Sequence, residues 1–282
     1  MSVTTFEVPV FSAEAAGTAV FHGATRLEIN RGGSYAVGGL TPTLEEVRAA
    51  AASLGGHSVP LRVMIRPRGK PLSGRPDFLY TDEELDEMRT CIGVFVAAGL
   101  LRPDRGDGFV FGVLEEAEET ETAMEKAVRI DVARCQMLVQ AASPFACVLH
   151  RAFDEVMATM GADGGIAAAI GCGFVGILTA GGVGAEGAMA NLDMLRKLVS
   201  RKGTKLEEVD GETKDMDTLE VIIGGGVRSR NLPELMTILS CSRRPVAFHS
   251  SCLGAENESE TVDGNEAAKI VELLRVGDGR RK

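Results

Sequence analysis

The chain has 282 residues, close to the roughly 250 of a single-domain (β/α)₈ barrel, and carries 30 Lys and Arg residues against 40 Asp and Glu residues. The net charge of −10 excludes a nucleic-acid binder driven by electrostatics, and an apolar content of 45% excludes wholesale disorder. Glycine is in excess, at 34 residues or about 12% of the chain against a usual roughly 7%, without the periodicity of collagen.

Short apolar runs alternate with amphipathic stretches along the chain, which is typical of a parallel sheet with crossover helices. Thr43 with Glu46 and Thr81 with Glu84 fit capping boxes that begin helices, and Thr41 before Pro42 also fits a helix start. Eight units favour a closed barrel over an open sheet, and no glycine-rich phosphate fingerprint follows the first strand. We therefore predict an α/β fold, a single (β/α)₈ TIM barrel over residues 1–282. Its strands are expected at residues 6–10, 26–30, 60–66, 108–114, 145–150, 174–179, 219–224 and 245–250.

Three further segments bear on organisation and compartment. Residues 115–125 and 201–217 are acidic or highly charged and are predicted to be loop insertions. Residues 164–185 lack charges, but eight of these 22 residues are glycine and the flanking residues are acidic, so we predict no membrane span there. The six cysteines form no C-x-x-C motif and no secretory signal is apparent, which indicates reduced thiols in a cytoplasmic protein.

The expected site lies at the carboxyl ends of the strands, where β/α barrels carry their chemistry. Strand alternation gathers polar side chains there, namely Glu7, Glu28, Arg66, Arg68, His150, Thr179 and His249. Burying charges is costly unless they are paired or used, so two interpretations remain open. Glu7 and Glu28 could pair with Arg66 and Arg68 as an internal ion-pair network, or the cluster could be a functional site.

The fifth strand ends in a second group of reactive residues. His150 could act as a general acid or base or as a metal ligand, with Asp154 orienting it and Arg151 holding an anion. Alternatively, Arg151 and Asp154 form a simple ion pair in the loop. His249 is similarly placed after the eighth strand.

A glycine triplet, formed by Gly224, Gly225 and Gly226, follows the seventh strand. Barrels often bind phosphate with the loops after strands seven and eight, where glycine lets backbone N–H groups approach an anion. The triplet could equally serve only a tight turn, so the anion site stays one of two interpretations.

Five motifs resemble the CutC copper homeostasis family in order and spacing. They are VMIRPRG at residues 63–69, DFLYTD at 77–82, LHRAFD at 149–154, ILTAG at 177–181 and FHSS at 248–251. The resemblance implies a TIM barrel, a cytoplasmic protein connected with copper, and a homo-oligomer. It also implies copper binding through cysteines near the ends of the first two strands, where this chain has Pro9 and Asn30. Cu(I) selects sulfur ligands, and Cys252, just past His249, is the remaining Cys or Met at a predicted strand mouth. His249 and Cys252 are therefore the remaining candidates for a metal site.

Two functional hypotheses follow, with a copper ion or a small anionic molecule as the partner, and the residues leave open whether the chain is an enzyme. The first is a protein that binds or handles copper without turnover, which the resemblance implies. The second is an enzyme acting by acid–base chemistry on a small anionic metabolite, with Glu7 or Glu28 as base, His150 as acid and Asp154 as its partner. The residues expected to hold the anion are Arg66, Arg68, Arg151, Thr179, Gly224, Gly225 and Gly226.

Overall fold

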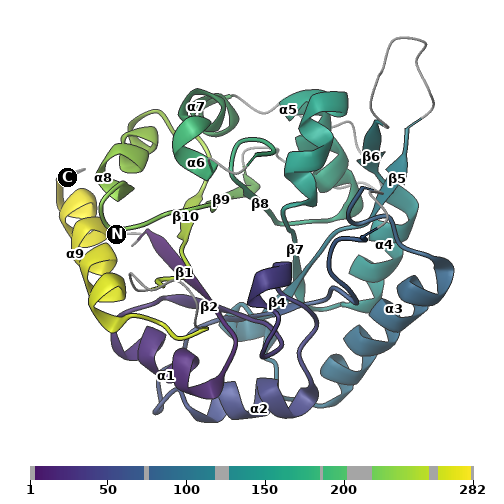
Figure 1. Cartoon of the computed structure of the whole chain (residues 1–282), viewed down its shortest axis with the longest axis horizontal. Helices are drawn as coiled ribbons and strands as arrows, with labels where there is room; N and C mark the ends of the chain where they lie inside the picture. The colour runs from purple at the N-terminus through teal and green to yellow at the C-terminus, as the bar shows by residue number, and fades with distance from the viewer. Residues whose placement is uncertain are drawn as a thin grey trace.

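The computed structural model describes residues 4–72, 76–117, 127–184, 187–201, 218–253 and 260–280. Eight parallel strands close into a barrel in the order β1-β10-β9-β8-β7-β4-β3-β2, and helices surround it (Figure 1). This confirms the predicted (β/α)₈ TIM barrel. The barrel strands are β1 (Thr5–Val10), β2 (Arg26–Ile29), β3 (Leu61–Met64), β4 (Gly108–Phe111), β7 (Ala146–Leu149), β8 (Gly176–Thr179), β9 (Glu220–Ile223) and β10 (Val246–His249).

Helices follow the strands in chain order and form the outer ring. They are α1 (Ala13–Phe21), α2 (Leu44–Ala52), α3 (Asp82–Ala97), α4 (Val132–Ala141), α5 (Ala152–Cys172), α6 (Gly187–Ala190), α7 (Leu192–Ser200), α8 (Leu232–Leu235) and α9 (Gly264–Arg280), with short 3₁₀ turns η1 (Tyr35–Val37), η2 (Pro103–Arg105) and η4 (Met236–Ser240). Both predicted capping boxes are present, at the starts of α2 and α3. The expected helix start at Thr41 was wrong, because its hydroxyl instead accepts a hydrogen bond from the Arg66 N–H at 2.8 Å. None of the described helices is long and apolar enough to cross a membrane.

A small hairpin leaves the barrel between β4 and α4 (Figure 1). It pairs β5 (Leu114–Glu116) with β6 (Val128–Ile130) in antiparallel register. The predicted loop insertion at 115–125 therefore begins in a strand, and its residues 118–125 lie outside the described part of the chain. Of the insertion predicted at 201–217, only Arg201 is described.

The barrel interior combines an apolar cluster with buried charged side chains. Met64, Val110, Val148, Leu178, Ile222 and Ala247 form the apolar cluster, with one residue from each of six strands. The strands β1 and β2 contribute Glu7, Arg26 and Glu28 instead, all less than 7% exposed. Arg62 on β3 and Glu220 on β9 lie near these residues, so the interior has a charged part that plain barrels, filled with branched apolar side chains, do not have.

The two ends of the described chain meet beside α9. The N–H of Thr4 donates to the carboxylate of Asp278 at 2.9 Å, and the Thr4 hydroxyl donates to the same group at 2.7 Å. This contact fixes α9 against the start of β1, the strand that carries Glu7.

Candidate functional site

A cavity of about 800 Å³ opens at the carboxyl ends of the strands. Glu28, Asn30 and Met64 line one part of it, and the loops after the later strands supply much of the rest. Other predicted residues on its wall are Arg66, His150, Arg151, Asp154, Thr179, Gly224, Gly225, Gly226 and His249. The mouth of the barrel is thus hollow and polar, where β/α barrels place their ligands.

A chain of four ionisable groups, Glu220, Arg26, Glu7 and His249, runs from the barrel interior to the cavity wall. The Arg26 guanidinium donates through Nε to Glu7 Oε2 at 2.5 Å and through Nη1 to Glu220 Oε2 at 2.9 Å. Glu7 Oε1 lies 2.8 Å from His249 Nδ1. Although burial opposes it, the charge of Arg26 holds the pKa of Glu7 well below its usual range, so this carboxyl is ionised. Glu7 is therefore already paired, and pairing with Arg66 or Arg68, one of the two interpretations above, was wrong.

Glu28 sits next to this chain without a cation of its own. One ligand atom from each of Glu7, Glu28 and His249 lies within 4.8 Å of the other two. Glu28 Oε1 accepts a hydrogen bond from Asn30 Nδ2 at 3.1 Å, while its Oε2 is buried with no partner among the described residues. Burial raises the pKa of Glu28, and the nearby charge of Glu7 adds to this rise. Glu28 and His249 thus form a carboxyl–imidazole pair suited to exchanging a proton.

His249 is the imidazole member of the Glu28–His249 pair. Burial works to lower its pKa, but the hydrogen bond to Glu7 and the charges of Glu28 and Glu7 raise it above 6.5. Because the Glu7 carboxylate accepts from Nδ1–H, the second ring nitrogen is the one left for a ligand. His249 lines the cavity, so Glu7 has the geometry of a positioning residue behind an acid–base imidazole.

His150 also lies on the cavity wall, but its pKa is shifted in the opposite direction from that of His249. The Ala152 N–H donates to His150 Nδ1 at 3.2 Å, and His150 Nε2 is buried without a partner among the described residues. Burial lowers its pKa well below 6.5, and the charges of Arg66 and Arg151 add to this effect. His150 is therefore neutral near pH 7. Asp154, predicted to orient this ring, contacts Thr179 instead.

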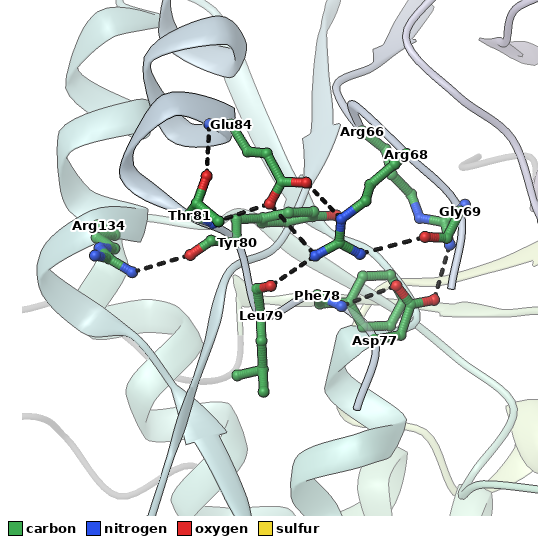
Figure 2. Close-up of polar contacts among 10 residues, drawn as sticks. All are labelled: Arg66, Arg68, Gly69, Asp77, Phe78, Leu79, Tyr80, Thr81, Glu84 and Arg134. Carbon is green, nitrogen blue, oxygen red and sulfur yellow. Dashed lines mark hydrogen bonds and ion pairs between the residues drawn. The ribbon is translucent and has the colours of Figure 1, made fainter. Parts of the chain in front are cut away.

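Arg66 is buried, and both terminal nitrogens of its guanidinium donate to groups of the protein, while its Nε has no partner among the described residues (Figure 2). Its guanidinium donates to Asp77 Oδ2 at 2.8 Å and to the carbonyls of Val37 and Gly39 at 2.6 and 2.9 Å. It also lies over the ring of Phe78, with 5.3 Å from its central carbon to the ring centroid. Since its charge is already neutralised by Asp77, Arg66 supports the cavity wall and is a poor candidate for the anion clamp predicted from the sequence.

Arg68 is directed away from the cavity. Figure 2 shows its guanidinium between Glu84 and the carbonyl of Leu79. The two contacts are 2.5 and 2.7 Å long, and the central guanidinium carbon lies 5.1 Å from the centroid of the Tyr80 ring. Arg68 is not among the residues that line the cavity. The prediction that Arg68 binds the anion does not agree with this geometry. Arg68 lies two residues beyond Arg66, past the barrel mouth, and pairs with Glu84 in the first turn of α3.

Asp154 and Thr179 hold the loop after β8. The Thr179 hydroxyl donates to Asp154 Oδ1, and the Ala180 N–H donates to Asp154 Oδ2 at 2.9 Å. Burial raises the pKa of Asp154 to about 6, although these hydrogen bonds oppose the rise. Asp154 forms no ion pair with Arg151 among the described contacts, so the simple loop ion pair is also absent there.

Two arginines on the cavity wall remain without an acidic partner among the described residues, Arg151 and Arg228. Arg228 donates to the hydroxyls of Ser250 and Ser251 at 3.3 and 3.2 Å and to the carbonyl of Val227. The Arg151 guanidinium lies so close to Gly38 that any side chain there would collide with it. These two guanidinium groups, together with the glycine loop at 224–226, form the side of the cavity suited to an anion.

Sequence reasoning missed four of these residues. Arg26 and Glu220 sit at the first inward positions of their strands, and Arg26 shares a face with Glu28, a signal that the strand alternation contained. Arg228 lies two residues after the glycine triplet. Phe78 stacks on His150 with ring centroids 4.4 Å apart and has a φ of 64°, a conformation that sequence patterns do not indicate.

The predicted metal ligand Cys252 lies apart from the cavity. It is fully buried in the apolar core, its thiol faces the carbonyl of Ser250 at 3.6 Å, and burial raises its pKa to about 12. Among the described residues that line the cavity, Met64 carries the only sulfur atom. Cu(I) selects thiolate and thioether ligands, so the residues at this mouth do not fit a Cu(I) site.

Comparison with known proteins finds relatives of this chain in one family. The model of the CutC family matches residues 4–251. The copper homeostasis protein cutC homolog of Drosophila melanogaster is 28% identical over 89% of this chain and 78% of its own length. A CutC family protein of Vibrio parahaemolyticus is 32% identical over 83% of this chain and 77% of its own.

A solved structure agrees with this result. The crystal structure of the putative copper homeostasis protein CutC from Streptococcus agalactiae superimposes with a TM-score of 0.62 at 23% identity, covering 87% of this chain and 98% of that one. At this identity the likeness supports the barrel fold alone. The match of the family model over most of the chain goes further, and it shows that this protein belongs to the CutC family.

Proposed function

We propose that this CutC family member binds a small anionic metabolite in the barrel mouth and moves a proton to or from it through the Glu28–His249 pair. The observation that carries this proposal is the chain from Arg26 through Glu7 to His249, with a 2.8 Å contact at Nδ1. A carboxylate that fixes one nitrogen of an imidazole, and leaves the other for a cavity, is the arrangement that acid–base catalysis needs.

The electrostatics of the pair support proton exchange. Burial raises the pKa of Glu28, so its carboxyl can hold a proton at a higher pH than an exposed glutamate. Although burial opposes it, the Glu7 and Glu28 carboxylates raise the pKa of His249. A group exchanges protons most efficiently when its pKa lies near the working pH. Glu7 stays ionised throughout and stabilises the imidazolium form of His249.

The anionic class of ligand follows from Arg151 and Arg228. Both line the cavity, and neither forms an ion pair with a described carboxylate. An unpaired guanidinium is a strong hydrogen-bond donor to a carboxylate or phosphate. The glycine loop at 224–226 adds backbone that an anion can approach closely.

Anion binding tests this proposal. We expect inorganic phosphate or pyruvate to bind with one site per chain in calorimetric titration, and Arg228→Met to weaken the affinity by at least about tenfold because one charge-assisted contact is lost. Arg230→Met, two residues along and exposed, is the matched control and should bind like the wild type. Equal affinity in Arg228→Met and the wild type would contradict the proposal.

A second candidate function, copper handling, is favoured by the family and by the Glu7, Glu28 and His249 cluster. Nitrogen and carboxylate ligands suit Cu(II) and Zn(II) rather than Cu(I). Copper as cargo would therefore bind in its oxidised form through Glu28 and His249. In the same titration set, tight Cu(II) binding that is lost in His249→Gln, combined with no anion binding, would favour this second function over the first.

We also propose that the protein acts in the cytoplasm and as a homo-oligomer. The six cysteines are all free, which supports a reducing compartment. The exposed Phe21, with 80% of its surface accessible, supports contact with another chain.

A further inference from the structure

His150 holds one nitrogen that nothing in the described protein satisfies. Its Nδ1 accepts a hydrogen bond from the Ala152 N–H at 3.2 Å, so in a neutral ring the proton must sit on Nε2. That Nε2 is buried, has no partner among the described residues, and belongs to a residue on the cavity wall. A buried donor without a partner costs free energy unless a ligand completes it.

The surroundings of His150 keep its ring fixed and uncharged. Phe78 packs against one side with ring centroids 4.4 Å apart, and this contact requires Phe78 to hold a left-handed backbone with a φ of 64°. Such a conformation is costly for a residue with a side chain and persists only where the surrounding structure holds it in place. Arg66 and Arg151 oppose a positive charge on the imidazole. His150 therefore offers an N–H donor and keeps its proton.

We propose that His150 Nε2–H donates a hydrogen bond to a carbonyl oxygen of the ligand, which makes the substrate an anionic carbonyl compound such as a 2-oxo acid. This inference rests on the proposed function and names its substrate class. A neutral imidazole is a suitable partner for an oxygen that becomes negative during reaction, because it stabilises the charge without first losing its own proton. The adjacent anion is held by Arg151 and Arg228.

The corresponding step is proton abstraction next to the carbonyl group. The C–H bond breaks, its proton passes to the Glu28–His249 pair, and its electron pair forms a C=C bond. The carbonyl oxygen becomes an enolate oxygen that accepts the hydrogen bond from His150. Return of a proton to carbon completes the step, and no oxidant or reductant is consumed.

Two ligands that differ in a single functional group test the assignment. Pyruvate and propionate share a carboxylate, but only pyruvate carries a carbonyl oxygen beside it. We expect the wild type to prefer pyruvate by at least about tenfold, and His150→Leu to lose this preference while keeping its affinity for propionate. His150→Gln supplies an N–H donor on a side chain of similar length and should restore part of the preference.

Nitrogen-15 NMR of the histidine rings provides a second measurement without any ligand. We expect His150 to show the neutral Nε2–H form from pH 5 to pH 8, and comparison with His150→Leu identifies its signals. A cationic ring at pH 7, or a proton on Nδ1, would overturn the inference. Equal binding of both ligands by the wild type and His150→Leu would also overturn it, while leaving anion binding intact. Binding of neither ligand would instead contradict the proposed function, and with it this assignment.

Discussion

Some charged residues at the barrel mouth form ion pairs and hydrogen bonds within the protein, whereas others keep buried atoms without a partner among the described residues. Arg66 has Asp77 and two carbonyls, and Arg68 has Glu84, so both are structural. Glu28 Oε2 and His150 Nε2 are buried on the cavity wall without partners among the described residues. Asn30 Oδ1 and Arg66 Nε, on the same wall, are also buried without a described partner, so this wall offers a ligand several polar atoms to contact.

The state of His249 gives a prediction at the residue scale. Its pKa is raised in the folded chain, so its protonation stabilises the fold below the unfolded value of about 6.5, and this contribution is lost as the pH rises through the folded pKa. In Glu7→Gln the pKa of His249 should fall by roughly one unit or more, because the charged hydrogen-bond acceptor is removed. NMR titration of the four histidines measures this directly.

Glu45→Gln, at an exposed ion pair with Arg48, is the control and should leave the pKa of His249 unchanged. An unchanged midpoint in Glu7→Gln would show that Glu7 does not position this imidazole. His249→Gln identifies the signal that belongs to the residue.

Single residues were predictable from the sequence where strand alternation sets their direction. Glu28, His150 and His249 reach the cavity as expected. Their partners were less predictable, because Asp77, the partner of Arg66, lies eleven positions further along the chain and no periodicity links the two residues. The same holds for Ala152, whose backbone N–H fixes the tautomer of His150 only through the turn that begins α5.

At the scale of elements, the strands could be located because each is a short apolar run bounded by polar residues. All eight barrel strands lie within the expected ranges or within one residue of them. The hairpin of β5 and β6 was missed, since its strands are three residues each and β5 contains two glutamates. Helix starts at Thr43 and Thr81 were predictable because capping is a local interaction.

Two glycines give a matched prediction for the elements that carry them. Gly108 begins β4, and a Cβ there would overlap the carbonyl of Ala146 in β7, whereas Gly93 in α3 faces open space. Gly108→Ala should lower the free energy of unfolding by about 1–3 kcal/mol or more through overpacking. Gly93→Ala should raise it by about 0.5–1 kcal/mol, because alanine is the better helix former. Urea unfolding measures both, and a change of the same sign in the two variants would contradict the described strand pairing.

For the whole molecule, barrel closure brings β1 and β10 together and thereby builds the site. Glu7 lies opposite His249 in this register, so the contact joins residues 242 positions apart in the chain. The excess of glycine also finds part of its explanation here, since Gly38 gives space to Arg151 and the triplet at 224–226 lines the cavity. The family model matches residues 4–251, and among the described residues at the mouth only Met64 carries a sulfur atom.

The most direct test of the central claim is a crystal structure of the reduced wild-type protein grown with pyruvate. We predict density for the carboxylate beside Arg228 or Arg151, with the carbonyl oxygen within hydrogen-bond distance of His150 Nε2 and the methyl carbon facing Glu28 and His249. A cavity that holds no anion at saturating pyruvate would contradict this account, as would pyruvate bound only outside the barrel mouth.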